Sequence, residues 1–242
     1  MQYLLFHSPF GLSAKRLAAS LGLSAVRNLP TRSTEVKVAW GAPDAPSSAL
    51  NGGIRVGKLH QLKTWAEASL STLTTSTSPR TGWLHRSGNS FGGRDFSRTL
   101  PSSSGYWTKP VENVINEYRV HVIRKPGSTK RTPQNYSVVR LGRKINVEPQ
   151  LNKIVNDVQI RSRQFGWRLE YFGSSMRRVL SEDLSLQCRW AIATLGWDFG
   201  AIDVLETEDG KYVLLEANSA PSLRDDNTLK AYADAIKEII GG

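Results

Sequence analysis

Two segments decide the fold of this chain: Asp198-Phe-Gly-Ala-Ile-Asp203 and Leu214-Leu-Glu216-Ala-Asn218-Ser-Ala-Pro221. Between them, Glu208-Asp-Gly210 is a typical hairpin turn sequence, so the two segments are predicted to be paired strands. Glu216 and Asn218 are two residues apart, and their side chains therefore leave the same face of the strand. The turn places Asp203 roughly opposite Glu216, so three oxygen ligands converge on one face of the hairpin.

Carboxylates in an otherwise apolar strand cost free energy unless a cation or hydrogen bonds satisfy them. Mg²⁺ takes a few oxygen ligands from a protein and fills its remaining positions with water and phosphate oxygens. The side chains of Asp203, Glu216 and Asn218 therefore fit a magnesium site. On geometry alone, the polar face of an edge hairpin explains the pattern better, because polar-outward alternation is common in antiparallel sheets.

The identity of the residues favours the metal site, because residues 198–221 closely resemble the metal-binding hairpin of the ATP-grasp superfamily. D-alanine–D-alanine ligases, ribosomal-protein glutamate ligases and short ATP-grasp proteins encoded by bacteriophages carry similar hairpins. The resemblance implies that Asp203, Glu216 and Asn218 hold two Mg²⁺ ions, or Mn²⁺ in their place, on the phosphates of ATP.

Further motifs follow in the order that this resemblance requires, across residues 86 to 221. Glu117-Tyr-Arg-Val-His-Val resembles the strand whose leading Glu binds the ribose of the nucleotide. Tyr106-Trp107-Thr108-Lys109 resembles the hinge over adenine, and Arg86 stands where the family usually has a Lys that contacts phosphate. The loop 87–93 resembles the lid over the phosphates, where small residues let backbone N–H groups approach an anion. Its glycines are Gly88, Gly92 and Gly93.

Arg161-Ser-Arg163-Gln-Phe-Gly166-Trp167 lies between the ribose strand and the metal hairpin, and the phage-type members have a similar Arg-x-x-x-x-Gly-Trp. The resemblance implies that Arg161 and, as the second choice, Arg163 stabilise the transferred phosphoryl group or the acyl phosphate by charge-assisted hydrogen bonds. The equal alternative is that Arg161 and Arg163 are surface arginines without a role in the reaction. Ala201 stands where D-alanine ligases have an Arg, so their substrate is not implied for this chain.

Apolar periodicity and turn residues predict the other elements. The predicted strands are 2–7, 36–40, 83–85, 106–109, 117–123, 137–141, 167–172, 199–205 and 211–217, and the predicted helices are 13–21, 58–70, 184–195 and 226–239. Gly196 is placed to cap the third of these helices in a left-handed conformation. In the strand 117–123, His121 falls on the polar face with Glu117 and Arg119, and we interpret it as a solvated side chain, with a role in the site as the alternative.

Gly52-Gly-Ile-Arg-Val-Gly57-Lys58 fits the start of a phosphate-binding P-loop. However, Leu59 replaces the Ser or Thr that such a loop needs to contact Mg²⁺, and no clear strand precedes the motif. We therefore interpret these residues as the beginning of the helix at 58–70.

The chain has 242 residues, enough for one large domain or two to three small ones. Hydrophobic residues make up 39% and charged residues 22%, which is ordinary for a soluble protein, and no apolar run is long enough to predict a transmembrane helix. The N-terminus lacks the features of a signal peptide. Cys188 is the only cysteine, so no internal disulfide can form, and we expect a buried thiol in a reducing cytoplasm.

The net charge is +11, and eight basic residues without any acidic residue lie between Tyr118 and Val147. Such a segment suggests an anionic ligand or partner. An acidic peptide or protein substrate, another polyanion and a nucleic acid all meet this description, and a solvated basic surface is an equal alternative. Charge alone does not choose among them.

The expected fold is α/β, of the ATP-grasp type. It comprises an N-terminal α/β domain (1–70), a lid subdomain (71–112) and a C-terminal ATP-grasp subdomain (113–242), with ATP between the last two. The implied reaction is phosphoryl transfer from Mg·ATP to a carboxylate, followed by attack of an amine and release of ADP and phosphate. The expected location is the cytoplasm, that of the host for a phage protein. The rival interpretation is a basic nucleic-acid-binding protein whose hairpin is structural.

Overall fold

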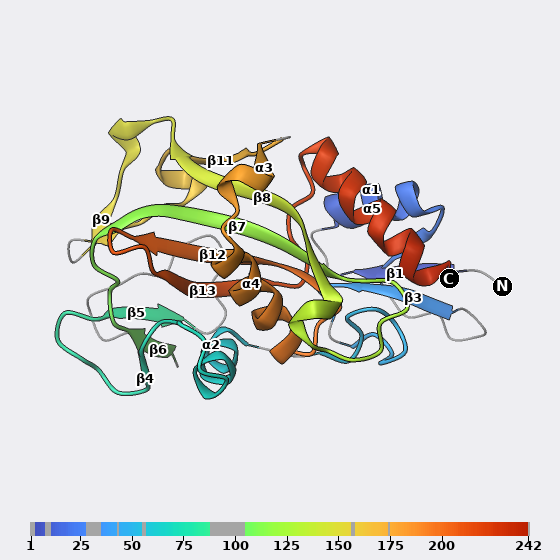
Figure 1. Ribbon diagram of the computed structural model, residues 1–242, viewed down its shortest axis with the longest axis horizontal. Helices are drawn as coiled ribbons and strands as arrows, with labels where there is room; N and C mark the ends of the chain where they lie inside the picture. Colours follow the sequence, from blue (N-terminus) through green and yellow to red (C-terminus); the bar gives the residue numbers. More distant parts are fainter. Residues whose placement is uncertain are drawn as a thin grey trace.

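The computed structural model describes residues 3–7, 11–27, 35–42, 44–54, 57–87, 105–155, 158–173 and 175–241. In this part of the chain the strands form one five-stranded sheet, two three-stranded sheets and a two-stranded hairpin (Figure 1). The five-stranded sheet lies at the centre, and it carries the hairpin on which the sequence interpretation depends.

The central sheet is antiparallel and has the strand order β11-β8-β7-β12-β13. Its strands are β7 (Val114–Arg124), β8 (Tyr136–Asn146), β11 (Trp167–Tyr171), β12 (Phe199–Thr207) and β13 (Tyr212–Asn218). The predicted turn between β12 and β13 is confirmed, and Gly210 takes the positive φ of 76° that glycine tolerates. Asp203 lies opposite Glu216 in the register of the two strands, as the hairpin pattern predicts.

Helices α2 (Lys58–Glu67), α3 (Met176–Val179) and α4 (Glu182–Thr194) lie beside the central sheet, where α4 crosses its face in Figure 1. Val120 and Val122 of β7 are fully buried in the same core as Trp65 of α2 and Ala191 of α4. This alternation of β7 is the one the sequence predicts. The Ser181 hydroxyl caps α4 by accepting from Leu184 N (3.1 Å), and Gly196 follows the helix with the predicted positive φ of 71°.

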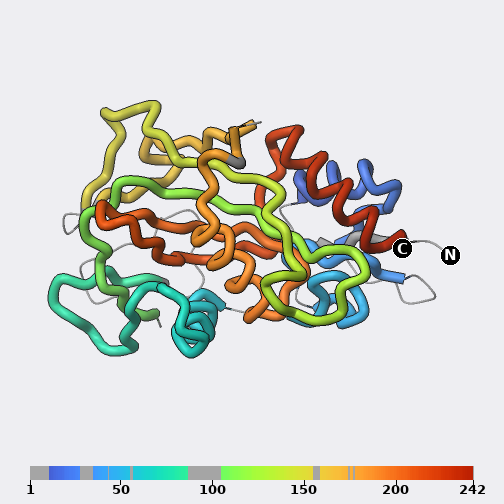
Figure 2. The backbone as a smooth tube through the Cα atoms, in the orientation of Figure 1, coloured from blue at the N-terminus to red at the C-terminus, as the bar shows by residue number. Residues whose placement is uncertain are grey.

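The N-terminal sheet is parallel, with the order β2-β1-β3, and two helices belong to the same region. Its elements are β1 (Tyr3–His7), α1 (Leu12–Leu21), β2 (Ser24–Val26) and β3 (Glu35–Trp40), with α5 (Asp226–Ile240) from the end of the chain. Helices α1 and α5 lie side by side (Figure 2). Leu17, Trp40, Phe199 and Tyr232 form one buried cluster, so the first and last elements of the chain pack on the same end of the central sheet.

A small sheet of order β4-β6-β5 lies next to α2 and the hairpin β12–β13 (Figure 1). The remaining elements are β4 (Thr75–Ser76), β5 (Leu84–Ser87), β6 (Gly105–Thr108), β9 (Ile154–Val155), β10 (Val158–Gln159) and the short 3₁₀ helices η1 (Pro133–Asn135), η2 (Pro149–Leu151) and η3 (Arg163–Phe165). Leu84 of β5 packs against Ile160 and Phe165, so the small sheet and the segment after β8 meet.

Cys188 is fully buried in α4, as expected, and burial raises the pKa of its thiol. Within the described ranges, none of the helices combines the length and the apolar character that crossing a membrane requires.

Candidate active site

One face of the central sheet gathers the charged residues that the sequence singles out. Arg119 on β7 pairs in register with Asp203 on β12, and Asp203 in turn lies opposite Glu216 on β13. Asn218 follows Glu216 by two residues and leaves the strand on the same side. The strand order therefore assembles a row of charged and polar side chains that runs across three neighbouring strands.

Asp203 is bound on both carboxylate oxygens by one arginine. Arg119 donates from Nε to Oδ1 (2.7 Å) and from Nη2 to Oδ2 (2.7 Å), and Asp203 is only 4% exposed. Burial alone raises the pKa of Asp203, but the charge and the hydrogen bonds of Arg119 outweigh it and hold this pKa below its usual value. Asp203 is thus an ionised, oriented carboxylate.

Glu216 pairs with Lys58, whose Nζ lies 2.7 Å from Oε2. Lys58 is the first residue of α2, so the start of that helix lies against the predicted metal hairpin. The predicted start of a helix at Lys58 is confirmed, whereas residues 55–56 of the preceding segment lie outside the described residues. Lys58 was not assigned to the site from the sequence. The motif Gly57-Lys58 is the only feature of the sequence that indicates a phosphate-binding lysine here. That Lys58 reaches Glu216 follows from the packing of α2 against β13.

The amide of Asn218 carries a buried Nδ2 that has no hydrogen-bond partner among the described residues. An orphaned polar atom of this kind calls for a ligand or a turned amide. Turned by half a rotation, the amide presents its oxygen instead, and with the carboxylates of Asp203 and Glu216 it forms a set of hard oxygen donors. This set fits Mg²⁺, although Arg119 and Lys58 must share or release the two carboxylates.

The described residues contain no group of three or more His, Cys, Asp or Glu side chains that could hold a metal ion. The set above does not need such a group, because its third donor is an amide. Mg²⁺ is commonly bound through one or two carboxylates, with substrate phosphates completing the site.

Glu117 lies at the other end of the row, next to a second lysine. Lys144 of β8 donates to the Glu117 carboxylate and also to the carbonyl oxygen of Arg161 (2.8 Å). Glu117 is 5% exposed, and burial raises its pKa while the charge of Lys144 opposes the shift. The pairing of Glu117 with Lys144 was not foreseen, because the two residues lie on different strands.

The structure places Arg161 beside Glu117. Arg161 donates from Nη2 to the carbonyl of Val114 (3.0 Å), and its guanidinium lies 5.1 Å from the centre of the Trp167 ring. Burial lowers the pKa of Arg161, and the charge of Glu117 counteracts this. Arg163 begins η3 and is exposed.

The small sheet carries the remaining predicted nucleotide residues. Arg86 donates from Nε to the Thr108 hydroxyl (3.0 Å), and Tyr106, Trp107 and Thr108 are buried in β6. Burial raises the pKa of Tyr106, with opposing effects from the nearby charges of Arg86 and Glu216. Tyr106 is thus near enough to Glu216, on the predicted metal hairpin, to sense its charge. Gly88, Gly92 and Gly93 of the predicted lid lie outside the described residues.

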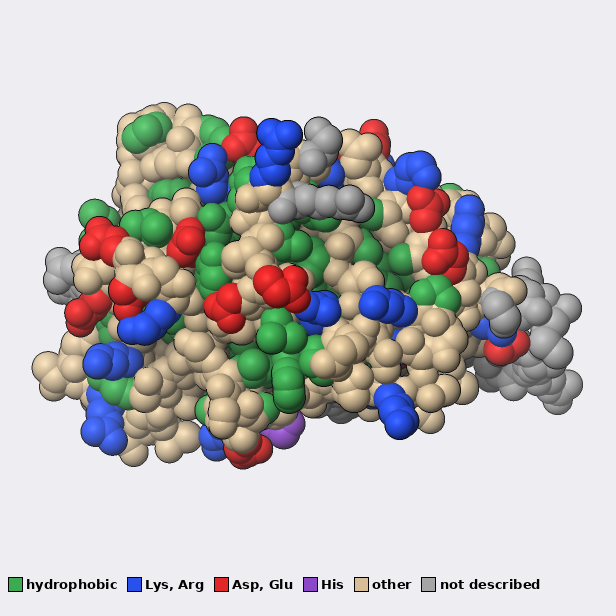
Figure 3. All heavy atoms as spheres, viewed as in Figure 1, with side chains coloured by type: hydrophobic (Ala, Val, Ile, Leu, Met, Phe, Trp, Pro, Cys, Tyr) green, Lys and Arg blue, Asp and Glu red, His purple; other side chains and the backbone are tan. Residues whose placement is uncertain are grey.

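The basic segment 118–147 is largely neutralised within the chain. Six of its eight basic side chains pair with acidic residues, among them Arg124 and Arg131 with Asp198, Arg140 with Asp225, and Arg143 with Glu170. Lys125 and Lys130 are exposed. On the face shown in Figure 3, basic and acidic side chains are interspersed. The segment therefore offers a polyanion much less charge than its sequence suggests.

His121 is fully buried, which corrects its interpretation as a solvated side chain. Its ring nitrogens lie 3.1 Å from the Tyr232 hydroxyl and 3.2 Å from the Tyr171 hydroxyl. Both faces of β7 are covered here, because α5 places Tyr232 over the face that the sequence marks as polar. Burial, followed by the positive charge of Arg119, lowers the pKa of His121 to about 3.

This burial predicts an acid sensitivity that is specific to His121. The folded imidazole takes up a proton only near pH 3, whereas the unfolded one does so near 6.5, so stability is lost as the pH falls from 6.5 toward 3. Between pH 7 and 5 we expect this residue alone to remove about 2 kcal/mol from the free energy of unfolding. Urea unfolding at both pH values should show a smaller difference for His121→Gln than for the wild type. Parallel pH dependences of the two proteins would contradict the assignment.

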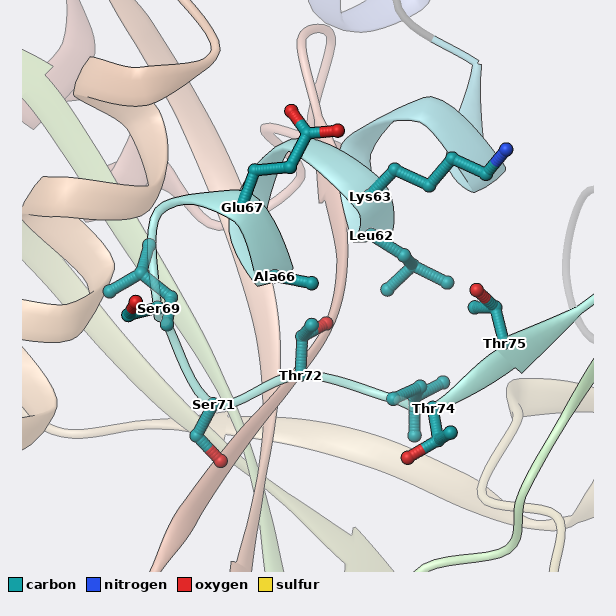
Figure 4. Close-up of a pocket in the computed structure, with 11 residues that line it drawn as sticks. Leu62, Lys63, Ala66, Glu67, Ser69, Ser71, Thr72, Thr74 and Thr75 are labelled. Carbon is teal, nitrogen blue, oxygen red and sulfur yellow. The ribbon is translucent and has the colours of Figure 1, made fainter.

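Two pockets lie along the segment 69–75, and one of them adjoins α2. The larger, about 620 Å³, lies between α2 and the segment 69–75, and Figure 4 shows Thr72 pointing toward Ala66 across it. No predicted site residue lines this pocket. The smaller, about 290 Å³, is bounded by Lys109 of the predicted hinge and by Val213 of β13. We therefore locate the candidate site from its charged residues and not from these two pockets.

No protein-family model matches the sequence, and no curated protein does. Solved structures do match the fold. The ATP-grasp ligase PsnB, complexed with a minimal precursor, aligns with a TM-score of 0.60 at 12% identity over 98% of each chain. The macrocyclase MdnC from Microcystis aeruginosa, bound with precursor peptide MdnA, gives 0.54 at 12% identity over 96% of this chain and 98% of that chain.

An N5-carboxyaminoimidazole ribonucleotide synthetase from Thermotoga maritima aligns with a TM-score of 0.60 at 9% identity, over 99% of this chain and 76% of that chain. At sequence identities this low, the structural alignments show a shared fold alone, and the chemistry has to be argued from the residues.

Proposed function

Because the chain has the ATP-grasp fold, we propose that it is an ATP-dependent carboxylate–amine ligase. In this proposal a carboxylate attacks the γ-phosphorus of ATP, the bond to the β-phosphate oxygen breaks, and an acyl phosphate and ADP form. An amine then attacks the acyl carbon, phosphate leaves, and the amine loses a proton. The fold class and the site residues both support this chemistry.

One observation carries the proposal: Asp203, Glu216 and Asn218 lie together on one face of the hairpin β12–β13. These residues would hold Mg²⁺, or Mn²⁺, whose charge offsets that of the ATP phosphates. Arg119 and Lys58 neutralise the two carboxylates here and would supply positive charge for the ATP phosphates if the metal took their place on the carboxylates. Such positioning and charge neutralisation are the main contributions of a protein to phosphoryl transfer.

The nucleoside part of ATP is proposed to lie toward Glu117, Lys144 and the small sheet. Glu117 would accept hydrogen bonds from the ribose, and the backbone of residues 106–109 would read the adenine edge. Arg86 and the glycine loop would contact phosphate. Arg163 keeps its proposed role toward the transferred phosphoryl group. For Arg161, which lies beside Glu117, we propose a contact near the ribose in place of that role.

For the second substrate we propose a peptide. PsnB was solved with precursor peptide PsnA2 and AMPPNP, and MdnC with its precursor peptide MdnA. A peptide carries both side-chain carboxylates and amines, so it can provide the carboxylate that is phosphorylated or the amine that attacks the acyl phosphate. The rival interpretation, a nucleic-acid-binding protein, loses its support because six of the eight bases in 118–147 are paired with acids.

The proposal predicts thermal stabilisation by nucleotide that requires a metal. A non-hydrolysable ATP analogue with Mg²⁺, at about 100 times its Kd, should add about 2.7 kcal/mol to the free energy of unfolding, because it binds only the folded state. For a chain of this size the melting temperature should rise by about 5–10 °C. EDTA should abolish most of the rise. A melting temperature that responds to DNA or RNA and not to the nucleotide would favour the rival.

A further inference from the structure

Helix α2 is joined to strand β13 between two of the proposed metal ligands. The Gln61 amide accepts from Ala217 N (2.8 Å) and donates to Ala217 O (3.0 Å), and Ala217 is flanked by Glu216 and Asn218. β13 is the outermost strand of the central sheet, so this side chain supplies the hydrogen bonds that a further strand would otherwise make. Gln61 is 3% exposed, and both of its bonds are shielded from water.

The same helix delivers Lys58 to Glu216. Lys58 precedes Gln61 by three residues, which places both on neighbouring parts of one helix face. Lys58 Nζ lies 2.7 Å from Glu216 Oε2 while Gln61 holds the adjacent peptide group. On the opposite edge, β13 is held by β12, where Asn218 pairs with Ala201. The segment 216–218 is thus fixed from both sides.

We propose that Gln61 is a positioning residue for the metal site: its amide sets the orientation of Glu216 and Asn218 and places Lys58 at the Glu216 carboxylate. The proposal rests on the proposed function, because it takes these two residues as ligands of the metal that accompanies the nucleotide. A bidentate amide is directional, and its loss leaves a buried N–H and C=O of Ala217 without partners, so the strand segment must shift to satisfy them.

Trp65 provides a matched control on the same helix. Its Nε1 donates to the carbonyl of Ala191 in α4 (3.0 Å), and the side chain is fully buried. This bond fastens α2 to α4 and not to β13. Trp65→Phe therefore loosens the helix without removing a hydrogen bond from the segment that carries Glu216 and Asn218.

The experiment compares Gln61→Met with Trp65→Phe, by calorimetric titration with Mg·ADP and by thermal unfolding. Both variants should have lower melting temperatures than the wild type. Gln61→Met should bind Mg·ADP about tenfold more weakly, whereas Trp65→Phe should stay within about twofold of the wild type. ADP without Mg²⁺ should bind Gln61→Met and the wild type equally, because the defect concerns the metal ligands. A merely structural role would not separate the two titrations.

Gln61→Asn serves as a second variant, since it keeps a polar amide but is one methylene too short to span to Ala217, and the same loss is expected. Normal Mg·ADP affinity in either Gln61 variant overturns the positioning role, and so does an equal loss in Trp65→Phe. A wild type that binds no Mg·ADP overturns the proposed function itself. The experiment therefore distinguishes failure of the Gln61 proposal from failure of the proposed ligase function.

Discussion

Glu216→Gln is expected to lower ATP turnover roughly 10²–10³-fold while leaving the fold intact. Glu216 is one of two carboxylates proposed to hold Mg²⁺, and the substitution removes its charge without changing its size. Its side chain is 22% exposed, and its partner Lys58 is about equally exposed. Partly exposed pairs contribute at most about 1 kcal/mol, so the free energy of unfolding should change little. ADP release and Mg·ADP affinity should both fall.

Glu206→Gln is the matched control. Glu206 belongs to the same hairpin, but its carboxylate accepts from Asn116 Nδ2 (2.6 Å) and from the Tyr118 hydroxyl (3.0 Å), neither of which is a proposed metal ligand. This variant should keep nearly all of the turnover, although it weakens two hydrogen bonds. If Glu216→Gln turns over ATP as well as Glu206→Gln does, Glu216 is not a metal ligand.

The elements with a strong pattern were predictable from the sequence. The strands 199–205 and 211–217 and the helix 226–239 are confirmed within a few residues, because alternation, turn residues and apolar periodicity agree there. β2 was missed, and so were β9 and β10, because two or three residues are too few to show a period. The strand predicted at 137–141 extends through Asn146. The added part of the strand contains Arg143 and Lys144, which pair with Glu170 and Glu117 on neighbouring strands. These pairings cannot be read from the local sequence.

Part of the candidate site was predictable for a similar reason. A two-residue spacing fixes the common face of Glu216 and Asn218, and a hairpin turn fixes the register of Asp203, so local sequence is sufficient. Lys58, Arg119 and Lys144 could not be assigned, because their partners depend on how α2 crosses β13 and on which strands become neighbours. The solvated interpretation of His121 failed for the same reason, since α5 covers it from the far end of the chain.

The largest effect on stability is expected at the buried pair. Asp203→Asn should lower the free energy of unfolding by about 3–5 kcal/mol, because it leaves the Arg119 guanidinium buried beside a neutral amide. Both Arg119 hydrogen bonds to Asp203 are 2.7 Å long, and the Asp203 side chain is only 5% exposed. Urea unfolding at pH 7 measures the loss. A change below about 1 kcal/mol would mean that water reaches the pair and screens it.

The double variant Asp203→Leu/Arg119→Met separates the charge effect from the packing effect. Replacing both partners of a buried ion pair with apolar residues is often nearly neutral, whereas replacing one is not. We therefore expect the double variant to recover most of the stability that Asp203→Asn loses, yet to bind Mg·ADP weakly and to turn over no ATP. Inactivity of Asp203→Asn alone would be ambiguous, because unfolding also abolishes turnover. A stable double variant that binds Mg·ADP with wild-type affinity would exclude Asp203 from the metal site.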